Sequence, residues 1–160
     1  LHPLSPNVAA KIQGDPIDLN SILDAFSRLS KAHPYLLVEG IGGLLVPIRD
    51  DLSVADLASM LGLPLLLIAR TTLGTINHTL LTLEAAAARN LEVRGVIYNT
   101  TRPSPSNKTT LTNPEVINLI SGIPYLGTLP YSIGLDVNTG CLGEMEMFVE
   151  THLDLDQLLT

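Results

Sequence analysis

The chain has 160 residues, of which 46% are hydrophobic, enough to build the core of a single domain over residues 1–160. Sixteen acidic residues against nine basic ones give a net charge of -7, which argues against nucleic acid or an anionic lipid surface as a partner. One cysteine, Cys141, rules out an internal disulfide and predicts a cytoplasmic protein. The longest apolar run, residues 63–69, is too short to cross a membrane.

The first predicted helix lies between about residues 18 and 32. Its apolar residues recur at three- and four-residue spacing, which places them on one helical face. They are Leu19, Ile22, Leu23, Phe26 and Leu29. Asp18 or Asn20 is suited to begin this helix, and Pro34 to end it.

Two apolar runs with a helix between them follow. Residues 35–38 predict a strand buried on both faces, which ends at Glu39. A helix is predicted over residues 53–61, with Asp56 three positions after the capping Ser53 and Gly62 as its stop. Residues 65–69 predict a second buried strand.

The same alternation continues to about residue 127. Ile76, Leu80, Leu83 and Ala87 mark a third helix, and residues 93–98 predict a strand that ends at Asn99. After a polar loop over residues 100–112, Asn113 and Pro114 are a strong helix start, and Gly122 is a natural stop. Residues 125–127 predict a weaker strand.

Strands that alternate with helices through short connections predict an α/β fold with a parallel sheet. Ligands of such sheets bind at the carboxyl ends of the strands, so the residues that follow each apolar run are candidate site residues. Among them Glu39 is the one carboxylate, and the glycines after it would let a nucleotide with bound Mg²⁺ approach the backbone. A solvated acid followed by a plain glycine turn explains this segment equally well.

Two further strand ends have open interpretations. Residues 71–78 pass from a strand to a helix start, where free N–H groups favour a carboxylate or phosphate, although an ordinary cap by Thr75 with His78 on the surface is the simpler reading. The Asn99 amide could bond both edges of a purine, but Asn is also a common turn residue. Cys141 has no His or second Cys nearby and is read as incidental.

Three segments taken together resemble the dethiobiotin synthetase family in content and order. They are Val38-Glu39-Gly40-Ile41-Gly42-Gly43-Leu44-Leu45-Val46-Pro47, then Thr72-Leu73-Gly74-Thr75-Ile76-Asn77-His78, and then Gly95-Val96-Ile97-Tyr98-Asn99. The resemblance runs from Ser5-Pro6 to Pro130, and the last thirty residues match loosely. It implies a three-layer fold like that of P-loop NTPases, here without the first strand and the phosphate loop.

The resemblance also implies the reaction. ATP and Mg²⁺ would drive the ring closure of 7,8-diaminononanoate with CO₂: a carbamate forms, ATP phosphorylates it, and the second amine closes the ring to dethiobiotin. A homodimer is implied, because one subunit would bind the diamine's carboxylate for its partner.

The family's site residues carry over onto matching positions of this sequence. Glu39 would bind Mg²⁺, and Gly40, Ile41 and Gly42 would lie against the nucleotide. The residues implied for the adenine are Asn99, Thr100, Leu129, Pro130 and Tyr131. Those implied for the diamine are Gly42 and Val46, with Leu73, Gly74, Thr75 and Asn77 at its carboxylate.

Two departures from the family pattern matter. Asn7 stands where the family has His after Ser-Pro, and no G-x-x-x-x-G-K-[ST] occurs, so the phosphate loop and the catalytic residues are expected upstream of Leu1. We therefore expect a fragment of a longer enzyme that is inactive alone. The alternatives are an ATP-dependent amidoligase of the cobyrinate type and a non-enzymatic paralogue that lost its phosphate loop.

Overall fold

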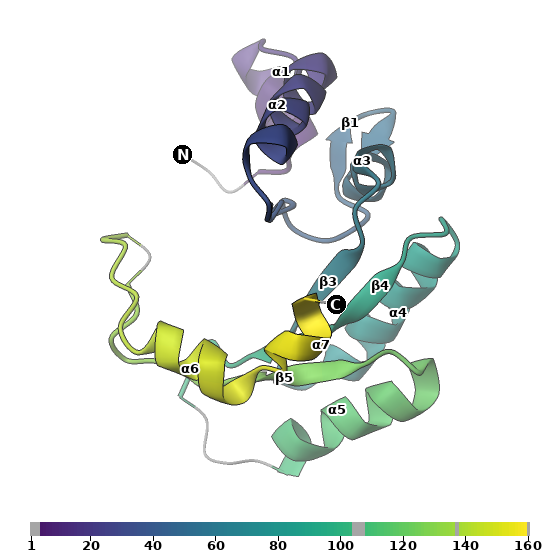
Figure 1. The fold of residues 1–160 in the computed structure, drawn as a ribbon. Coiled ribbons are helices and arrows are strands. Elements are labelled where there is room, and N and C mark those ends of the chain that lie inside the picture. The colour runs from purple at the N-terminus through teal and green to yellow at the C-terminus, as the bar shows by residue number, and fades with distance from the viewer. Residues whose placement is uncertain (1–3, 104–107, 137, 160) are drawn as a thin grey trace. The chain divides into compact units, whose positions relative to one another are not determined.

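The computed structural model describes residues 4–103, 108–136 and 138–159, which form two compact units (Figure 1). The first unit contains residues 4–63 together with Ala85–Leu91, and the second contains Pro64–Glu84 together with residues 92–159. No helix within these described ranges is long and apolar enough to span a membrane.

The first unit is built from three helices and a small hairpin. They are α1 (Pro6–Gln13), α2 (Leu19–Ala32), the antiparallel strands β1 (Pro47–Arg49) and β2 (Leu52–Ser53), and α3 (Val54–Leu61). The prediction of α2 is confirmed, and the Asp18 carboxylate accepts a hydrogen bond from the Asn20 amide at its start. Neither α1 nor the hairpin was predicted.

The capping residues predicted for α3 act as expected. The Ser53 hydroxyl accepts a hydrogen bond from the Asp56 amide, and the Asp56 carboxylate accepts one from the Ser53 amide at 2.8 Å. Hydrogen bonds from Ser53 hold the pKa of Asp56 below its usual value. Gly62 ends the helix with a left-handed φ of 65°.

The strand predicted over residues 35–38 is wrong. This segment has no regular structure, and the side chains of Tyr35 and Leu37 are 78% and 87% exposed. A strand needs a neighbour for its backbone hydrogen bonds, and no strand of the described residues pairs with this segment. Glu39 therefore does not follow a strand end.

The second unit is an α/β unit with a three-stranded parallel sheet, in the order β3-β4-β5. Its strands are β3 (Leu65–Arg70), β4 (Val93–Asn99) and β5 (Tyr125–Leu129), and its helices are α4 (Thr75–Ala87), α5 (Lys108–Ser121), α6 (Met145–His152) and α7 (Leu155–Leu159). The predicted parallel pairing of these strands is confirmed.

One face of the sheet carries the core of this unit. Val96 and Tyr98, two positions apart on β4, lie on the same face and are each 1% exposed. They cluster with Ala69 of β3, Leu83 of α4 and Ile117 of α5, so both helices cover this face. On β3 the prediction of full burial is wrong: Ile68 is 58% exposed, because β3 is an edge strand paired with β4 alone among the described strands.

The start of α5 differs from the prediction. The helix begins at Lys108 rather than at Asn113, so the second half of the predicted polar loop is helical, while residues 104–107 lie outside the described residues. Pro114 therefore sits inside the helix, where its missing N–H removes one intrahelical hydrogen bond. Ile117, which is 1% exposed, anchors the following turn in the core and offsets that loss.

The segment after α6 closes against β5 at a glycine. Leu153 forms an antiparallel bridge with Gly127, and the Asp154 amide donates to the Leu126 carbonyl at 2.8 Å. Gly127 has a φ of 130°, and a Cβ atom there would overlap the carbonyl oxygen of His152. Only glycine allows this approach of the two backbones.

We therefore predict that Gly127→Ala lowers the free energy of unfolding by about 3 kcal/mol, because the new methyl group meets backbone that cannot rotate away. Urea unfolding measures this loss. Gly122→Ala is the matched control, since Gly122 also has a positive φ, 68°, but a Cβ there meets nothing within 4 Å. The control should lose about 1–2 kcal/mol, and equal losses in the two variants would contradict the prediction.

Candidate functional site

The carboxyl ends of β4 and β5 bring together the residues predicted to bind adenine. Asn99 is paired with Leu129 in the sheet, and the Thr100 amide donates to the Leu129 carbonyl at 3.0 Å. Arg70 ends β3 beside Asn99 on the other side. Asn99, Thr100, Leu129 and the following Pro130 thus lie at one edge of the sheet.

The side chains at this edge are accessible. Asn99 and Thr100 are half-buried, and Tyr131 is 40% exposed. The Asn99 amide makes no hydrogen bond to another described residue, so its donor and its acceptor are both available. A planar ligand that presents a donor beside an acceptor, as a purine edge does, fits this arrangement.

Ser132 is a residue of this edge that the sequence did not single out. It is 8% exposed, and its Oγ finds no hydrogen-bond partner within the described residues. A buried hydroxyl is ordinarily paired. A single Ser after Pro-Tyr carries no recognisable pattern, so only the fold reveals it.

Tyr98 fixes the strand position next to Asn99. Its ring lies in the core, 5.8 Å from the ring of Tyr125, and its hydroxyl has no partner within the described residues. Burial and the nearby Tyr125 raise the pKa of Tyr98 to about 12. The core thus holds Tyr98 in its neutral form, and the side chain of the next residue, Asn99, points to the other face.

The predicted carboxylate site lies in the turn between β3 and α4. Leu73 is 94% exposed, Gly74 has a φ of 94°, and α4 begins at Thr75, which is buried. The Thr75 amide donates to the Thr72 carbonyl at 3.2 Å, which closes the turn, and the His78 amide donates to Gly74. The turn brings Leu73, Gly74 and Thr75 together with Asn77, which is exposed.

A small polar hollow adjoins this turn. It has a volume of about 120 Å³, and five polar side chains from the end of β3 and from α4 line part of it. These are Arg70, Thr75, His78, Thr79 and Thr82. The imidazole of His78 lies over Gly74, 3.4 Å from where a Cβ would be. His78 is exposed, as the simpler interpretation predicted, and its imidazole ring also contacts the turn.

The remaining predicted residues lie in a glycine-rich loop of the first unit. Gly42 has a φ of 73°, and a Cβ there would be 3.0 Å from Val46 Cγ2. The Val46 amide donates to the Gly43 carbonyl at 3.0 Å, which folds the loop back on itself. Gly42 and Val46, both predicted to contact the diamine, are thus direct neighbours, while Ile41 is 61% exposed.

Glu39 is exposed at the start of this loop, and its carboxylate makes no hydrogen bond or ion pair with another described residue. No group of three or more His, Cys, Asp or Glu side chains suited to a metal occurs in the part of the chain that the structure describes. A single hard carboxylate fits Mg²⁺ that takes its other ligands from phosphates and water.

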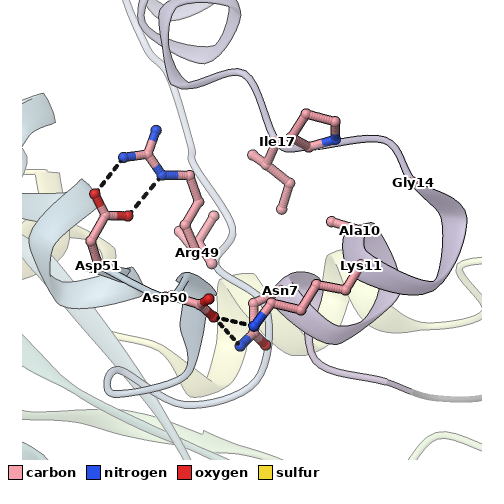
Figure 2. A pocket seen from close by; sticks show the side chains of 10 residues that line it. Asn7, Ala10, Lys11, Gly14, Ile17, Arg49, Asp50 and Asp51 are labelled. Carbon is pink, nitrogen blue, oxygen red and sulfur yellow. Dashed lines mark hydrogen bonds and ion pairs between the residues drawn. The ribbon is translucent and has the colours of Figure 1, made fainter.

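A larger hollow of about 480 Å³ in the first unit lies between α1 and β1 (Figure 2). Asp50 accepts hydrogen bonds from the Lys11 ammonium at 2.6 Å and from the Asn7 amide at 3.5 Å, and Arg49 pairs with Asp51. The bond from Lys11 lowers the pKa of Asp50. These charges are exposed and already neutralise one another, so the hollow presents no free charge to a ligand.

Comparison with known proteins gives consistent matches. A family model described as an AAA domain matches residues 1–139. An ATP-dependent dethiobiotin synthetase of Thermodesulfovibrio yellowstonii is 40% identical over 99% of this chain and 67% of its own length. Proteins of the same name from Bacillus subtilis and Bacillus cereus are 35% and 43% identical, over 98% and 82% of this chain and 65% and 54% of their own lengths. The chain thus spans between half and two thirds of the length of these relatives.

The buried Tyr98 predicts how stability changes at alkaline pH. The unfolded tyrosine ionises near pH 10 and the folded one at about 12, so the unfolded state loses its proton first and stability falls as pH rises between these values. In wild type the free energy of unfolding should fall by an amount on the order of 2 kcal/mol over this pH range, and Tyr98→Phe should abolish this fall. Urea unfolding at increasing pH measures it. Tyr35→Phe, at a side chain 78% exposed, should change nothing; parallel curves for wild type and Tyr98→Phe would contradict the assignment.

Proposed function

The chain belongs to the family of ATP-dependent dethiobiotin synthetases, and from this premise we propose that the protein containing it closes the ureido ring of dethiobiotin in biotin biosynthesis. The substrates are 7,8-diaminononanoate, CO₂ and ATP with Mg²⁺. The observation that carries the proposal is the pairing of Asn99 with Leu129 at the carboxyl edge of a parallel sheet, where ligands of such sheets bind.

The adenine of ATP is proposed to lie at this edge. The free donor and acceptor of Asn99 would bond the base, with Thr100 beside it. The half-exposed segment Leu129-Pro130-Tyr131 would cover its face, since Pro and Tyr side chains present flat apolar surfaces.

The triphosphate and its metal are proposed to lie at the glycine-rich loop. Gly40, Ile41 and Gly42 would let the nucleotide approach the backbone, and the unpaired carboxylate of Glu39 would bind Mg²⁺. The bound ion would offset the negative charge of the phosphates during phosphoryl transfer.

Two segments are proposed to bind the two ends of the diamine. The apolar Val46 side chain, which packs on Gly42, suits the methylene chain. In the turn formed by Leu73, Gly74, Thr75 and Asn77, the amides other than that of Thr75, which bonds Thr72, are proposed to bind the carboxylate. In a homodimer this turn would serve the partner's substrate. The exposure of Leu73, 94%, supports a role at a subunit contact.

The reaction proceeds through a carbamate. One amine of the substrate attacks CO₂, the γ-phosphoryl group of ATP is transferred to a carbamate oxygen, and the second amine attacks the carbon and displaces phosphate. We place the groups that bind the γ-phosphate and move these protons outside the 160 residues, because the sequence contains no G-x-x-x-x-G-K-[ST]. The reaction is proposed to take place in the cytoplasm, as one cysteine in the chain suggests.

The complete gene product should incorporate labelled bicarbonate into dethiobiotin when diamine, ATP and Mg²⁺ are supplied. The 160-residue chain alone should show no turnover under the same conditions. Mass spectrometry of the product distinguishes the closed ring from the open carbamate. No ring closure by the complete product would overturn the proposed function, and turnover by the chain alone would place the catalytic groups within it.

Asn99→Ala in the complete product should raise KM for ATP about ten-fold or more, because the base edge loses its partner. The preference for ATP over GTP should fall with it. Asn20→Ala, at an exposed residue of α2, is the control and should leave both quantities unchanged. An unaltered preference between the two nucleotides in Asn99→Ala would remove Asn99 from the base site.

A further inference from the structure

The start of α3 holds the glycine-rich loop through backbone hydrogen bonds. The Val54 amide donates to the Val46 carbonyl at 3.0 Å, and the Ala55 amide donates to the Leu44 carbonyl at 2.8 Å. Val54 and Ala55 are the first two residues of α3, and amides at this position have no partner within their own helix. The helix start and the loop therefore satisfy each other's backbone groups.

The side chain of Val54 adds a second contact to the same loop. A Cβ atom at Gly40 would lie 2.9 Å from Val54 Cγ1, closer than real Cβ atoms approach a neighbour. The valine thus packs directly on the backbone of Gly40 and leaves no room for a side chain. The Val54 side chain thus positions Gly40 at one end of the loop, and the Val54 amide positions Val46 at the other end.

The loop needs such support because it has little rigidity of its own. Gly40, Gly42 and Gly43 each have wide conformational freedom, and the loop contains no regular structure. The helix start that supports it is itself fixed by the reciprocal hydrogen bonds of Ser53 and Asp56. Ala55 is 0% exposed, which anchors this turn in the first unit.

We infer that Val54 is a positioning residue, which sets the Gly40–Val46 loop for nucleotide and diamine through its side chain on Gly40 and its amide on Val46. The inference rests on the proposed function, which assigns these ligands to the loop. Val54 itself touches neither ligand in that proposal. Its effect on the reaction is exerted through the loop backbone, where small displacements are costly for the reacting groups.

Val54→Ala in the complete gene product tests this role. The variant removes the atoms that pack on Gly40 but keeps the amide, and Ala favours the helix, so α3 itself is retained. KM for ATP and for the diamine should each rise about ten-fold. Val54→Ile, which keeps both Cγ atoms, should retain the wild-type values.

Val116→Ala is the matched control, because Val116 is a half-buried valine in a helix of the second unit, α5. It removes the same atoms and should leave both KM values unchanged. Wild-type KM values in Val54→Ala, or an equal rise in Val116→Ala, would overturn the inference.

Hydrogen exchange of the amides that bond the loop carbonyls gives a readout that does not depend on activity. In Val54→Ala the hydrogen-bonded amides of Val46 and Ala55 should exchange about ten-fold faster than in wild type, whereas Val54→Ile and Val116→Ala should not change them. If the wild-type protein closes no ring, the proposed function fails, and this measurement still decides the inference. Unchanged exchange in Val54→Ala would reject a positioning role for the valine.

Discussion

The parallel hydrogen bonding of β4 to its two neighbours is the constraint on which the second unit depends. Val96, Ile97 and Tyr98 are between 1% and 4% exposed, so this strand is held on both faces as well as on both edges. Because its register is fixed, Asn99 arrives beside Leu129 at one edge of the sheet. A slip of one residue would turn Asn99 into the core and Tyr98 out of it.

The first unit depends on a different kind of interaction. Its candidate residues lie in an irregular loop rather than at strand ends, and unsatisfied amides at a helix start supply the hydrogen bonds that a sheet would otherwise supply. Regular pairing therefore positions the residues proposed to bind adenine, while a helix terminus positions the loop from Gly40 to Val46. The strand ends and the glycine-rich loop therefore tolerate different substitutions. Backbone pairing depends little on which side chains the strands carry, whereas the contact of Val54 with Gly40 depends on the valine side chain.

The elements that sequence predicted well carry their own local signals. α2 and α3 have a periodic apolar face or a capping pair, and β4 contains the apolar run Val96-Ile97-Tyr98 and has a neighbouring strand on both sides. The run at residues 35–38 looks the same in sequence, yet it forms no strand, because pairing is a property of the neighbours and not of the run. The Asn-Pro signal at residue 113 likewise did not set the start of α5, which begins five residues earlier at Lys108.

The candidate site was predictable to a similar extent. Carboxyl ends of parallel strands identified Asn99 and Pro130, and the resemblance to a family supplied their roles. The burial of the Ser132 hydroxyl and the packing of Val54 on Gly40 depend on segments that meet only after folding. No local sequence pattern therefore predicts them.

The bridge between Gly127 and Leu153 also determines how the sheet behaves toward other molecules. A strand edge with free N–H and C=O groups is a template on which foreign chains can add further strands and begin to aggregate. The segment after α6 occupies the edge of β5 that β4 leaves open, with Leu153 and Asp154 bonded along it. The chain's own backbone therefore occupies the edge of β5 at Leu126 and Gly127, so a foreign strand cannot pair there, and it is the glycine at position 127 that leaves room for this contact.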